Sequence, residues 1–159
     1  MITQNIDGLH ARAGTSAARL IELHGTNALV ECQGCGWRGD PAPHFESFRR
    51  TRRPPRCGCG GFLKPATISF GQNLDPQTLD RAAGAAMAAD LVIALGSTLS
   101  VHPAASFPLL AARRGVPYVI INRGATEQDN EPRVTLRLEG DVGAIFPEAV
   151  ETALSIPTA

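Results

Sequence analysis

The sequence predicts an α/β protein built on a Rossmann-like, doubly wound parallel sheet. Strand and helix patterns alternate along the second half of the chain, which is the rhythm of such a sheet. Within it, residues 91–95 (LVIAL) form a continuous apolar run, as expected for a strand buried on both faces of a parallel sheet. Two close pairs of cysteines interrupt the pattern between residues 32 and 59 and indicate a small inserted module.

Length and composition are those of an ordinary globular domain. The chain has 159 residues, a formal net charge of +0 and 43% hydrophobic residues. No apolar run approaches the roughly 20 residues that span a bilayer, and no basic segment followed by an apolar run opens the chain. We therefore expect a cytoplasmic protein with no membrane partner. The neutral charge also argues against a nucleic-acid coat protein.

The early elements are expected to be short strands. Residues 1–3 read as the end of a strand, and residues 20–32 as two strands that break at Gly25-Thr26. Residues 64–70 are expected to form a strand that ends at Gly71. Because a functional loop normally follows a strand of about five residues or more, we expect the beginning of the strand at residues 1–3 to be absent.

The later elements follow in α/β order. Asp75 and Pro76 are an N-cap and first-turn pair, and we expect the helix that they open to run to about residue 89. The remaining predictions are a strand at 91–95, a helix from Pro103 to Gly115, a strand at 118–121, an edge strand at 134–138, and a last helix that Asp141 caps and Pro147 kinks.

Polar or glycine-bearing turns follow the predicted strands. Ligands of doubly wound sheets lie at the carboxyl ends of the strands, where four turns fall: residues 4–7, 24–25, 96–98 and 122–124. Ser97 and Thr98 offer hydroxyls to phosphate or ribose oxygens, and Asn122 offers a carboxamide to a ribose. Lone histidines are more often structural than catalytic. His24, however, lies beside glycine at a strand end, and an imidazole suits a general base near neutral pH.

The cysteines have the pattern of a structural zinc site. Two short pairs about twenty residues apart are typical of a Zn(Cys)4 centre, with four unrelated buried cysteines as the alternative. The second pair has one intervening residue where two are usual. If that segment is extended, both of its side chains point the same way, and we expect Gly58 to ease the strain. The predicted ligands are Cys32, Cys35, Cys57 and Cys59.

A basic run lies between the cysteine pairs. It consists of Arg49, Arg50, Arg52, Arg53 and Arg56. A solvated helix face is the favoured interpretation. Nucleic-acid binding is an alternative, but it would have few aromatic side chains nearby for base stacking. Attraction of an acidic protein substrate is a third.

With these motifs, the chain resembles a known family, the sirtuins, which are NAD-dependent protein deacylases. The resemblance covers nearly the whole chain. Its segments stand in sirtuin order: TQNIDGLH, ELHG, the two cysteine pairs, GGFLKPATISFG, GSTLSVHPAA, VIINRG and GDVGAIFPEAV.

The resemblance implies a role for each matching residue. His24 would be the catalytic base, helped by Asn5 and Asp7. The dinucleotide NAD would contact Gln4, Asn5, Ile6, Asp7, Gly96, Ser97, Thr98, Asn122, Arg123, Asp141 and Val142. An acyl-lysine peptide would pair as a strand with Phe70, Gly71, Leu99, Ser100, Val101 and His102.

The family chemistry is NAD-dependent deacylation. The acyl oxygen of the lysine attacks the ribose as nicotinamide leaves, and His24 then takes a proton from a ribose hydroxyl that attacks the acyl carbon. Hydrolysis then yields free lysine, nicotinamide and O-acyl-ADP-ribose. Zinc is structural, since four thiolates leave no open position for water.

The chain also departs from the family pattern. Gln72 replaces an acidic residue that usually follows Phe-Gly. The glycine-rich pyrophosphate loop, the flexible cofactor loop and the first strand of the family's sheet are not found. We therefore expect an incomplete sheet with its first strand missing, and a chain that alone is a weak or inactive deacylase. A non-catalytic zinc- and nucleotide-binding remnant or a partner-binding module is the alternative. The expected organisation is a first Rossmann-like part at 1–30, a zinc-binding module at 31–65 and a second Rossmann-like part at 66–159.

Overall fold

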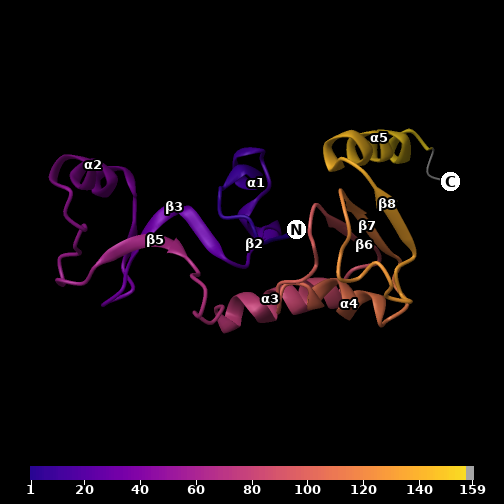
Figure 1. Ribbon diagram of the computed structural model, residues 1–159, viewed down its shortest axis with the longest axis horizontal. Coiled ribbons are helices and arrows are strands. Elements are labelled where there is room, and N and C mark those ends of the chain that lie inside the picture. Colours follow the sequence, from indigo (N-terminus) through magenta and orange to yellow (C-terminus); the bar gives the residue numbers. More distant parts are fainter. Residues whose placement is uncertain (157–159) are drawn as a thin grey trace. The chain divides into compact units, whose positions relative to one another are not determined.

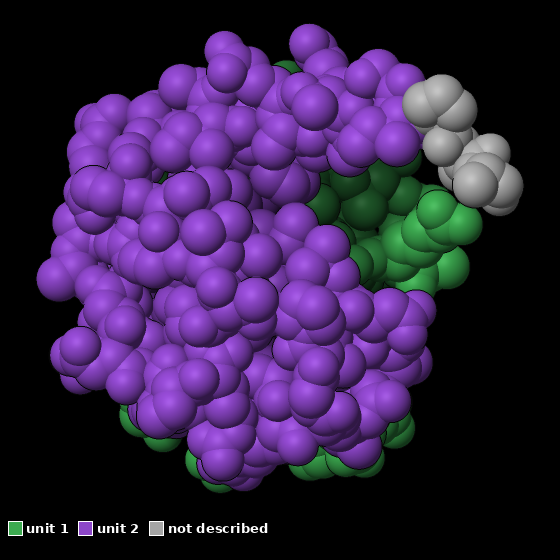
Figure 2. Space-filling view, turned by 90° about the vertical axis from the view of Figure 1, so that its right-hand side faces the viewer, with its two compact units in different colours: residues 1–81 green, residues 82–159 purple. Residues whose placement is uncertain are grey.

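The structure is a computed structural model that describes residues 1–156 of the chain (Figure 1). The chain divides into two compact units, Met1–Arg81 and Ala82–Ala159, which Figure 2 colours separately. Each unit is described by itself below. Among the described residues, none of the helices combines the length and the apolar character that crossing a bilayer requires.

The first unit opens with two short parallel strands. β1 (Ile2–Thr3) pairs with β2 (Ile21–Glu22), and α1 (Leu9–Arg12) and a 3-10 turn, η1 (Ala17–Arg19), connect them. The prediction of two strands within 20–32 is confirmed. The break between them, however, lies at residues 23–24, because β3 already begins at Gly25.

An antiparallel sheet organises the segment that carries the cysteines, which is called the zinc module below. The strand order is β4-β3-β5. The bounds are Gly25–Cys32 for β3, Arg38–Gly39 for β4, Leu63–Thr67 for β5 and Ala42–Thr51 for the helix α2. β5 ends before residue 70, since Ser69 and Gln72 close a turn with a 2.9 Å backbone hydrogen bond.

A helix with a side-chain cap leads onward. α3 (Pro76–Met87) begins where it was predicted, and the Asp75 carboxylate accepts the Thr78 N–H at 2.8 Å. Its buried residues are alanines, Ala82 and Ala86. Small side chains on one face allow close packing along the helix.

The second unit contains the larger parallel sheet. Its order is β6-β7-β8, with β6 at Val92–Leu95, β7 at Tyr118–Asn122 and β8 at Leu136–Glu139 (Figure 1). β7 is central and its Ile120 is fully buried. The expected edge position of the 134–138 segment is confirmed by β8.

The prediction that residues 91–95 are buried on both faces is wrong for this chain. β6 is the other edge strand of its sheet. Ile93 and Leu95 are 37% and 36% exposed. Alternate side chains point to opposite faces of a strand, so one face of β6 stays open while the other packs.

Two helices complete the second unit. α4 (Ser106–Ala112) is shorter than predicted because residues 101–105 form a turn, in which the Ala105 N–H donates to the Val101 carbonyl at 2.9 Å. α5 (Val142–Ser155) is capped as predicted, since Asp141 accepts the Ala144 N–H at 3.1 Å. The helix continues through Pro147.

A buried polar pair joins three segments of this unit. The Tyr118 hydroxyl donates to Gln128 Oε1 at 2.9 Å, and Gln128 Nε2 donates to the Ala105 carbonyl at 2.7 Å. Gln128 is only 6% exposed and Tyr118 is fully buried. Burial raises the pKa of the Tyr118 hydroxyl, which therefore stays neutral and acts as a donor.

Replacing Gln128 with leucine is expected to destabilise the chain by about 2–6 kcal/mol, because two buried polar groups lose their partner at about 1–3 kcal/mol each. Urea unfolding measures this change. The exposed Gln77→Leu is the matched control and should shift the midpoint little. In a double-mutant cycle, Tyr118→Phe should be much less harmful in the Gln128→Leu background. Additive effects would show that the two side chains do not act as a pair.

Candidate functional site

A polar hollow forms at the carboxyl ends of β1 and β2. Its volume is about 360 Å³, and the residues that line it are Gln4, Asn5, Ile6, Asp7, His24 and Ile68. His24 thus lies in one hollow with residues 4–7. The physical reason is the parallel pairing of Thr3 with Glu22, which makes both strands end at the same edge.

Hydrogen bonds hold the loop of residues 4–7 at several points. The Asn5 N–H donates to the Thr3 hydroxyl at 3.1 Å, and the Ile6 carbonyl accepts the Asn27 N–H at 2.8 Å. The Asp7 carboxylate accepts the Leu9 N–H at 2.9 Å and so also stabilises the start of α1. The loop is therefore presented on a fixed backbone.

The position of His24 depends on the glycine that follows it. Gly25 has φ 74°, and a Cβ there would lie 2.1 Å from the Ala66 carbonyl oxygen. Only glycine fits this close approach. The His24 carbonyl in turn accepts the Ile68 N–H at 2.9 Å, which explains why Ile68, a residue that sequence reasoning missed, lines the hollow.

The second unit brings together the other predicted cofactor residues. Gly96 follows β6, Asn122 is the last residue of β7, and Asp141 follows β8, and the parallel register of the strands aligns their carboxyl ends. A Cβ on Gly96 would lie 3.7 Å from Val142, and Arg123 pairs with Asp141 at 2.6 Å. The three strand ends thus form one cluster.

Several of these side chains already shape their own turns. Asn122 Nδ2 donates to the Gly124 carbonyl at 3.0 Å, and the Ser97 hydroxyl accepts the Leu99 N–H at 3.1 Å. The Thr98 hydroxyl lies 2.7 Å from that of Ser100. Contact of these groups with a nucleotide stays a prediction.

The two segments predicted to flank a peptide are not strands in this structure. Phe70 and Gly71 lie in a turn, and the ring of Phe70 is fully exposed. Leu99 has φ 54° and is 4% exposed, so its side chain belongs to the core beside Ala105 and Tyr118. Ser100, Val101 and His102 follow in bends and turns. Strand pairing would need these segments to extend.

Gln72 has a structural role beside Phe70. Its Oε1 accepts the Ser69 N–H at 2.8 Å and the Lys64 ammonium at 3.2 Å. Lys64 also donates to the Thr67 carbonyl. The neutral amide therefore closes the turn, a role that the sequence did not indicate.

A charged network fixes the loop after β7. Asp129 accepts the Thr126 hydroxyl at 2.6 Å, the Thr126 N–H at 3.0 Å and Arg137 Nε at 2.7 Å. These donors, the Thr126 hydroxyl first, lower the pKa of Asp129 from 3.8 to about 2. The ionised carboxylate therefore favours the folded chain.

This shift predicts an acid-sensitive contribution to stability. Because the folded pKa is the lower one, the contribution is full above pH 3.8 and is lost as the pH falls through about 2. Unfolding midpoints measured from pH 6 to 2 should depend less on pH in Asp129→Asn than in the wild type. Asp90→Asn, at an exposed carboxylate, is the control. Parallel curves for wild type and Asp129→Asn would contradict the assignment.

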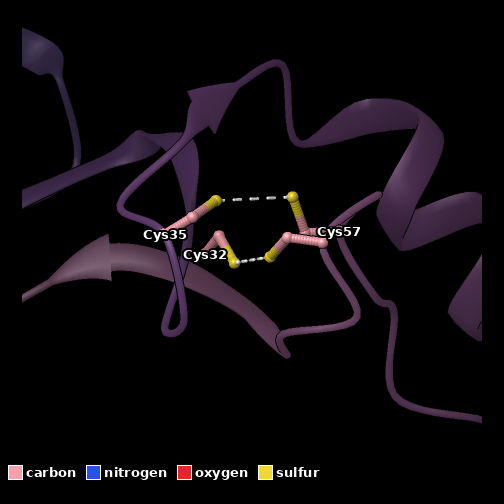
Figure 3. A group of neighbouring side chains, drawn as sticks. Cys32, Cys35 and Cys57 are labelled. Atoms are coloured by element: carbon pink, nitrogen blue, oxygen red, sulfur yellow. Dashed lines mark hydrogen bonds between the residues drawn. The ribbon is translucent and has the colours of Figure 1, made fainter.

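The four cysteines meet in the zinc module, as Figure 3 shows. Their sulfurs all lie within 4.8 Å of one another. Cys32 and Cys59 sulfurs are 3.4 Å apart, and those of Cys35 and Cys57 are 3.8 Å apart. A tetrahedral zinc with Zn–S bonds of about 2.3 Å needs sulfurs about 3.8 Å apart. The cluster therefore fits a tetrathiolate zinc site.

Backbone N–H groups point at the sulfurs, which favours thiolates. Gly34 N–H donates to Cys32 Sγ at 3.3 Å, and Gly61 N–H donates to Cys59 Sγ at 3.4 Å. N–H donors from Cys35 and Gly34 lower the pKa of Cys32 to about 6. The N–H of Trp37 lowers the pKa of Cys35, but the neighbouring sulfurs outweigh it and raise that pKa to about 12. A cation is what allows all four to ionise together.

The explanation given for the second cysteine pair needs correction. Residues 57–60 form a turn, closed by the Gly60 N–H on the Cys57 carbonyl at 2.8 Å, so the segment is not extended. A Cβ on Gly58 would meet nothing within 4 Å. A Cβ on Gly61 would lie 2.7 Å from Cys32 Sγ. Gly61, not Gly58, is the glycine that the sulfur cluster requires.

Fold and site together define an α/β protein with a parallel sheet and an inserted tetrathiolate module. The model of the Sir2 family matches residues 1–103. The chain therefore belongs to the Sir2 family, and the resemblance found in the sequence is confirmed.

Relatives and solved structures agree with this membership. An NAD-dependent protein deacetylase of Rhodopseudomonas palustris is 44% identical over 138 residues, which cover 86% of this chain and 54% of that protein. One from Haloarcula marismortui is 40% identical over 152 residues, covering 95% and 57%. A solved structure of Sir2 with a p53 peptide and NAD+ has a TM-score of 0.86 and 36% identity, and covers 96% of this chain and 62% of that chain. The chain spans about half the length of the curated relatives it matches.

Proposed function

We propose that this chain carries the base and the zinc module of a sirtuin-type, NAD-dependent protein lysine deacylase. The observation that carries the proposal is the hollow in which His24 faces the loop of residues 4–7, in a member of the Sir2 family. An imidazole, two carboxamides and a carboxylate in one hollow supply a proton acceptor and polar groups for an amide ligand.

In the first unit, His24 is the proposed general base. Asn5 orients a ribose or a water, and Asp7 and Ile6 hold the nicotinamide amide. Gln4 lies beside the ribose. The backbone bonds described above keep these groups in place, so that little ordering is needed on binding.

In the second unit, the turns after the three parallel strands are the proposed dinucleotide site. Gly96, Ser97 and Thr98 line it, Asn122 and Arg123 face the adenosine ribose, and Asp141 and Val142 face the adenine. The proposed peptide contacts are Phe70 and Gly71 in the first unit, and Leu99, Ser100, Val101 and His102 in the second. The nearness of Gly96 to Val142 supports the assignment of these turns to one dinucleotide site.

When bound, NAD supplies an electrophilic ribose carbon that the acyl group of the substrate can capture. The part of this chain is to accept a proton at the His24 imidazole from a ribose hydroxyl, and to keep the reacting groups oriented through Asn5. The four thiolates would hold zinc, which acts structurally and leaves no open position for water. Water then hydrolyses the adduct of ribose and acyl group, so that the lysine amine leaves, and the products are nicotinamide, O-acyl-ADP-ribose and free lysine.

Three further assignments belong to the proposal. The protein is cytoplasmic, which the four free thiols support, because thiols persist in reducing compartments. The partner is an acyl-lysine protein or peptide. The division into residues 1–30, 31–65 and 66–159 places the zinc module within a Rossmann-like domain.

The purified chain, incubated with NAD and an acetyl-lysine peptide, tests the proposal. Mass spectrometry should detect deacetylated peptide and O-acetyl-ADP-ribose in equal amounts, formed at no more than the low rate expected of this chain alone. Calorimetry with ADP-ribose, run in parallel, separates binding from turnover. Binding without products would favour the second candidate, a non-catalytic zinc- and nucleotide-binding protein. If the chain neither binds ADP-ribose nor forms products, both candidate functions are refuted.

A further inference from the structure

Four arginines at the end of α2 have exposed, unengaged side chains. We define the arginine turn as Arg49, Arg50, Arg52 and Arg53, all exposed. Among the described residues, none of their guanidinium groups makes a hydrogen bond or an ion pair. The neighbouring Arg56 differs, since it donates to the Gly60 carbonyl at 2.6 Å and stacks over the Phe62 ring at 3.9 Å. Arg56 is therefore excluded from the turn and read as structural.

The helix itself explains only part of this cluster. Cations in the last turn of a helix interact favourably with its dipole, which accounts for Arg49 and Arg50. Arg52, however, is the C-cap in the left-handed region, with φ 56°. That conformation costs a non-glycine residue about 1 kcal/mol and usually falls to glycine or asparagine. An arginine held there points to a use for its charge.

The backbone of the turn is ordered before any partner arrives. The Arg52 N–H donates to the Phe48 carbonyl at 2.7 Å, and the Thr51 hydroxyl accepts the Arg53 N–H at 3.2 Å. Pro54 and Pro55 follow and restrict the chain further. Binding would therefore order side chains only, which lowers its entropic cost.

Positive charge is concentrated in this module. Residues 31–65 hold seven lysines and arginines against three acidic residues, whereas the whole chain has a net charge of +0. Of the three acids, Glu31 is already paired with Arg38 at 2.5 Å. The exposed charge of the turn is therefore complementary to an acidic surface.

We propose that the arginine turn binds an acidic segment of a partner protein, a short run of aspartates and glutamates. Guanidinium groups bind carboxylates in paired hydrogen bonds, and four of them match a segment of similar length. A nucleic acid is less suited, because α2 offers only two aromatic side chains, Phe45 and Phe48, and single-strand binding relies on a series of stacking rings. The proposal does not depend on deacylase activity.

The test uses a fluorescein-labelled octaglutamate peptide and fluorescence anisotropy at 50 and 300 mM salt. The wild-type chain should bind the peptide, and more weakly at the higher salt. Arg49→Gln/Arg50→Gln/Arg53→Gln should weaken binding about tenfold. The control Arg12→Gln/Arg19→Gln/Arg113→Gln removes the same charge from exposed arginines that make no side-chain bond among the described residues, and should change affinity less than twofold. Equal losses in both triple variants would overturn the proposal, as would no binding by the wild type.

Arg52→Gly separates charge from folding. Because glycine suits φ 56°, its melting temperature should be equal to or above that of the wild type, while peptide affinity falls about threefold. Unchanged affinity would overturn the proposal. An oligothymidylate of the same charge is the second probe. Should it bind more tightly than the peptide and respond to the same variants, the partner is a nucleic acid and the proposal is wrong.

Discussion

His24→Ala is expected to lower the rate of NAD-dependent deacylation by about 10²–10⁴-fold, the usual worth of a positioned general base. The reason is the place of the imidazole in the hollow beside Asn5 and Asp7, at a backbone position that Gly25 makes possible. ADP-ribose binding should fall much less, because a proton acceptor contributes to the reaction more than to binding. Turnover assays and calorimetry measure the two effects separately.

The controls for this variant lie in the same unit. Zinc content should stay at one ion per chain, because the four predicted ligands are cysteines and His24 is not among them. His10→Ala, at a histidine outside the hollow, should leave turnover nearly unchanged. Activity that survives in His24→Ala would remove this residue from the mechanism, whatever becomes of the family assignment.

Gly61→Ala is expected to lower zinc affinity by about 10–100-fold, as changes to the shell around metal ligands do. The added methyl group would lie 2.7 Å from Cys32 Sγ and 3.0 Å from the Gly34 nitrogen. Either Cys32 Sγ moves from the position that a tetrahedral zinc site needs, or the Gly34 N–H loses its hydrogen bond to Cys32 Sγ. Competition with a chromophoric chelator measures the affinity. Since metal binding contributes to folding, the melting temperature should fall as well.

Gly58→Ala is the matched control, in the same turn and with the same added methyl group. Its Cβ would meet nothing within 4 Å, and its φ lies outside the left-handed region. Zinc affinity should therefore change little. If Gly58→Ala weakened zinc as much as Gly61→Ala, flexibility of the turn rather than contact with the sulfur would be the controlling factor.

The sequence predicted the order of elements well where patterns are local. The cap at Asp75, the cap at Asp141 and the edge position of the 134–138 segment all follow from short-range rules, and the structure has them. The prediction that residues 91–95 are buried on both faces, by contrast, is wrong. An apolar run predicts a buried strand, but which neighbours cover it depends on pairing partners far away in the sequence.

For the candidate site, too, the sequence predicted the local features and missed those that depend on distant contacts. Spacing alone predicted four converging cysteines, because ligand spacing is a local property of zinc sites. It assigned the wrong glycine, since the need for Gly61 comes from the approach of a strand end to Cys32 across the module. The Tyr118–Gln128 pair also left no pattern in the sequence, as neither residue type suggests burial.

The strand β3 connects the hollow with the sulfur cluster. It starts at Gly25, next to His24, where the Asn27 N–H anchors the loop of residues 4–7 through the Ile6 carbonyl. It ends at Cys32, a predicted metal ligand, roughly 23 Å further along at the usual rise of a strand. β3 therefore links the two sites through the backbone. Oxidation of the thiols would release the Cys32 end of the strand, and we expect the resulting movement to reach the His24 imidazole without any direct contact between metal and substrate.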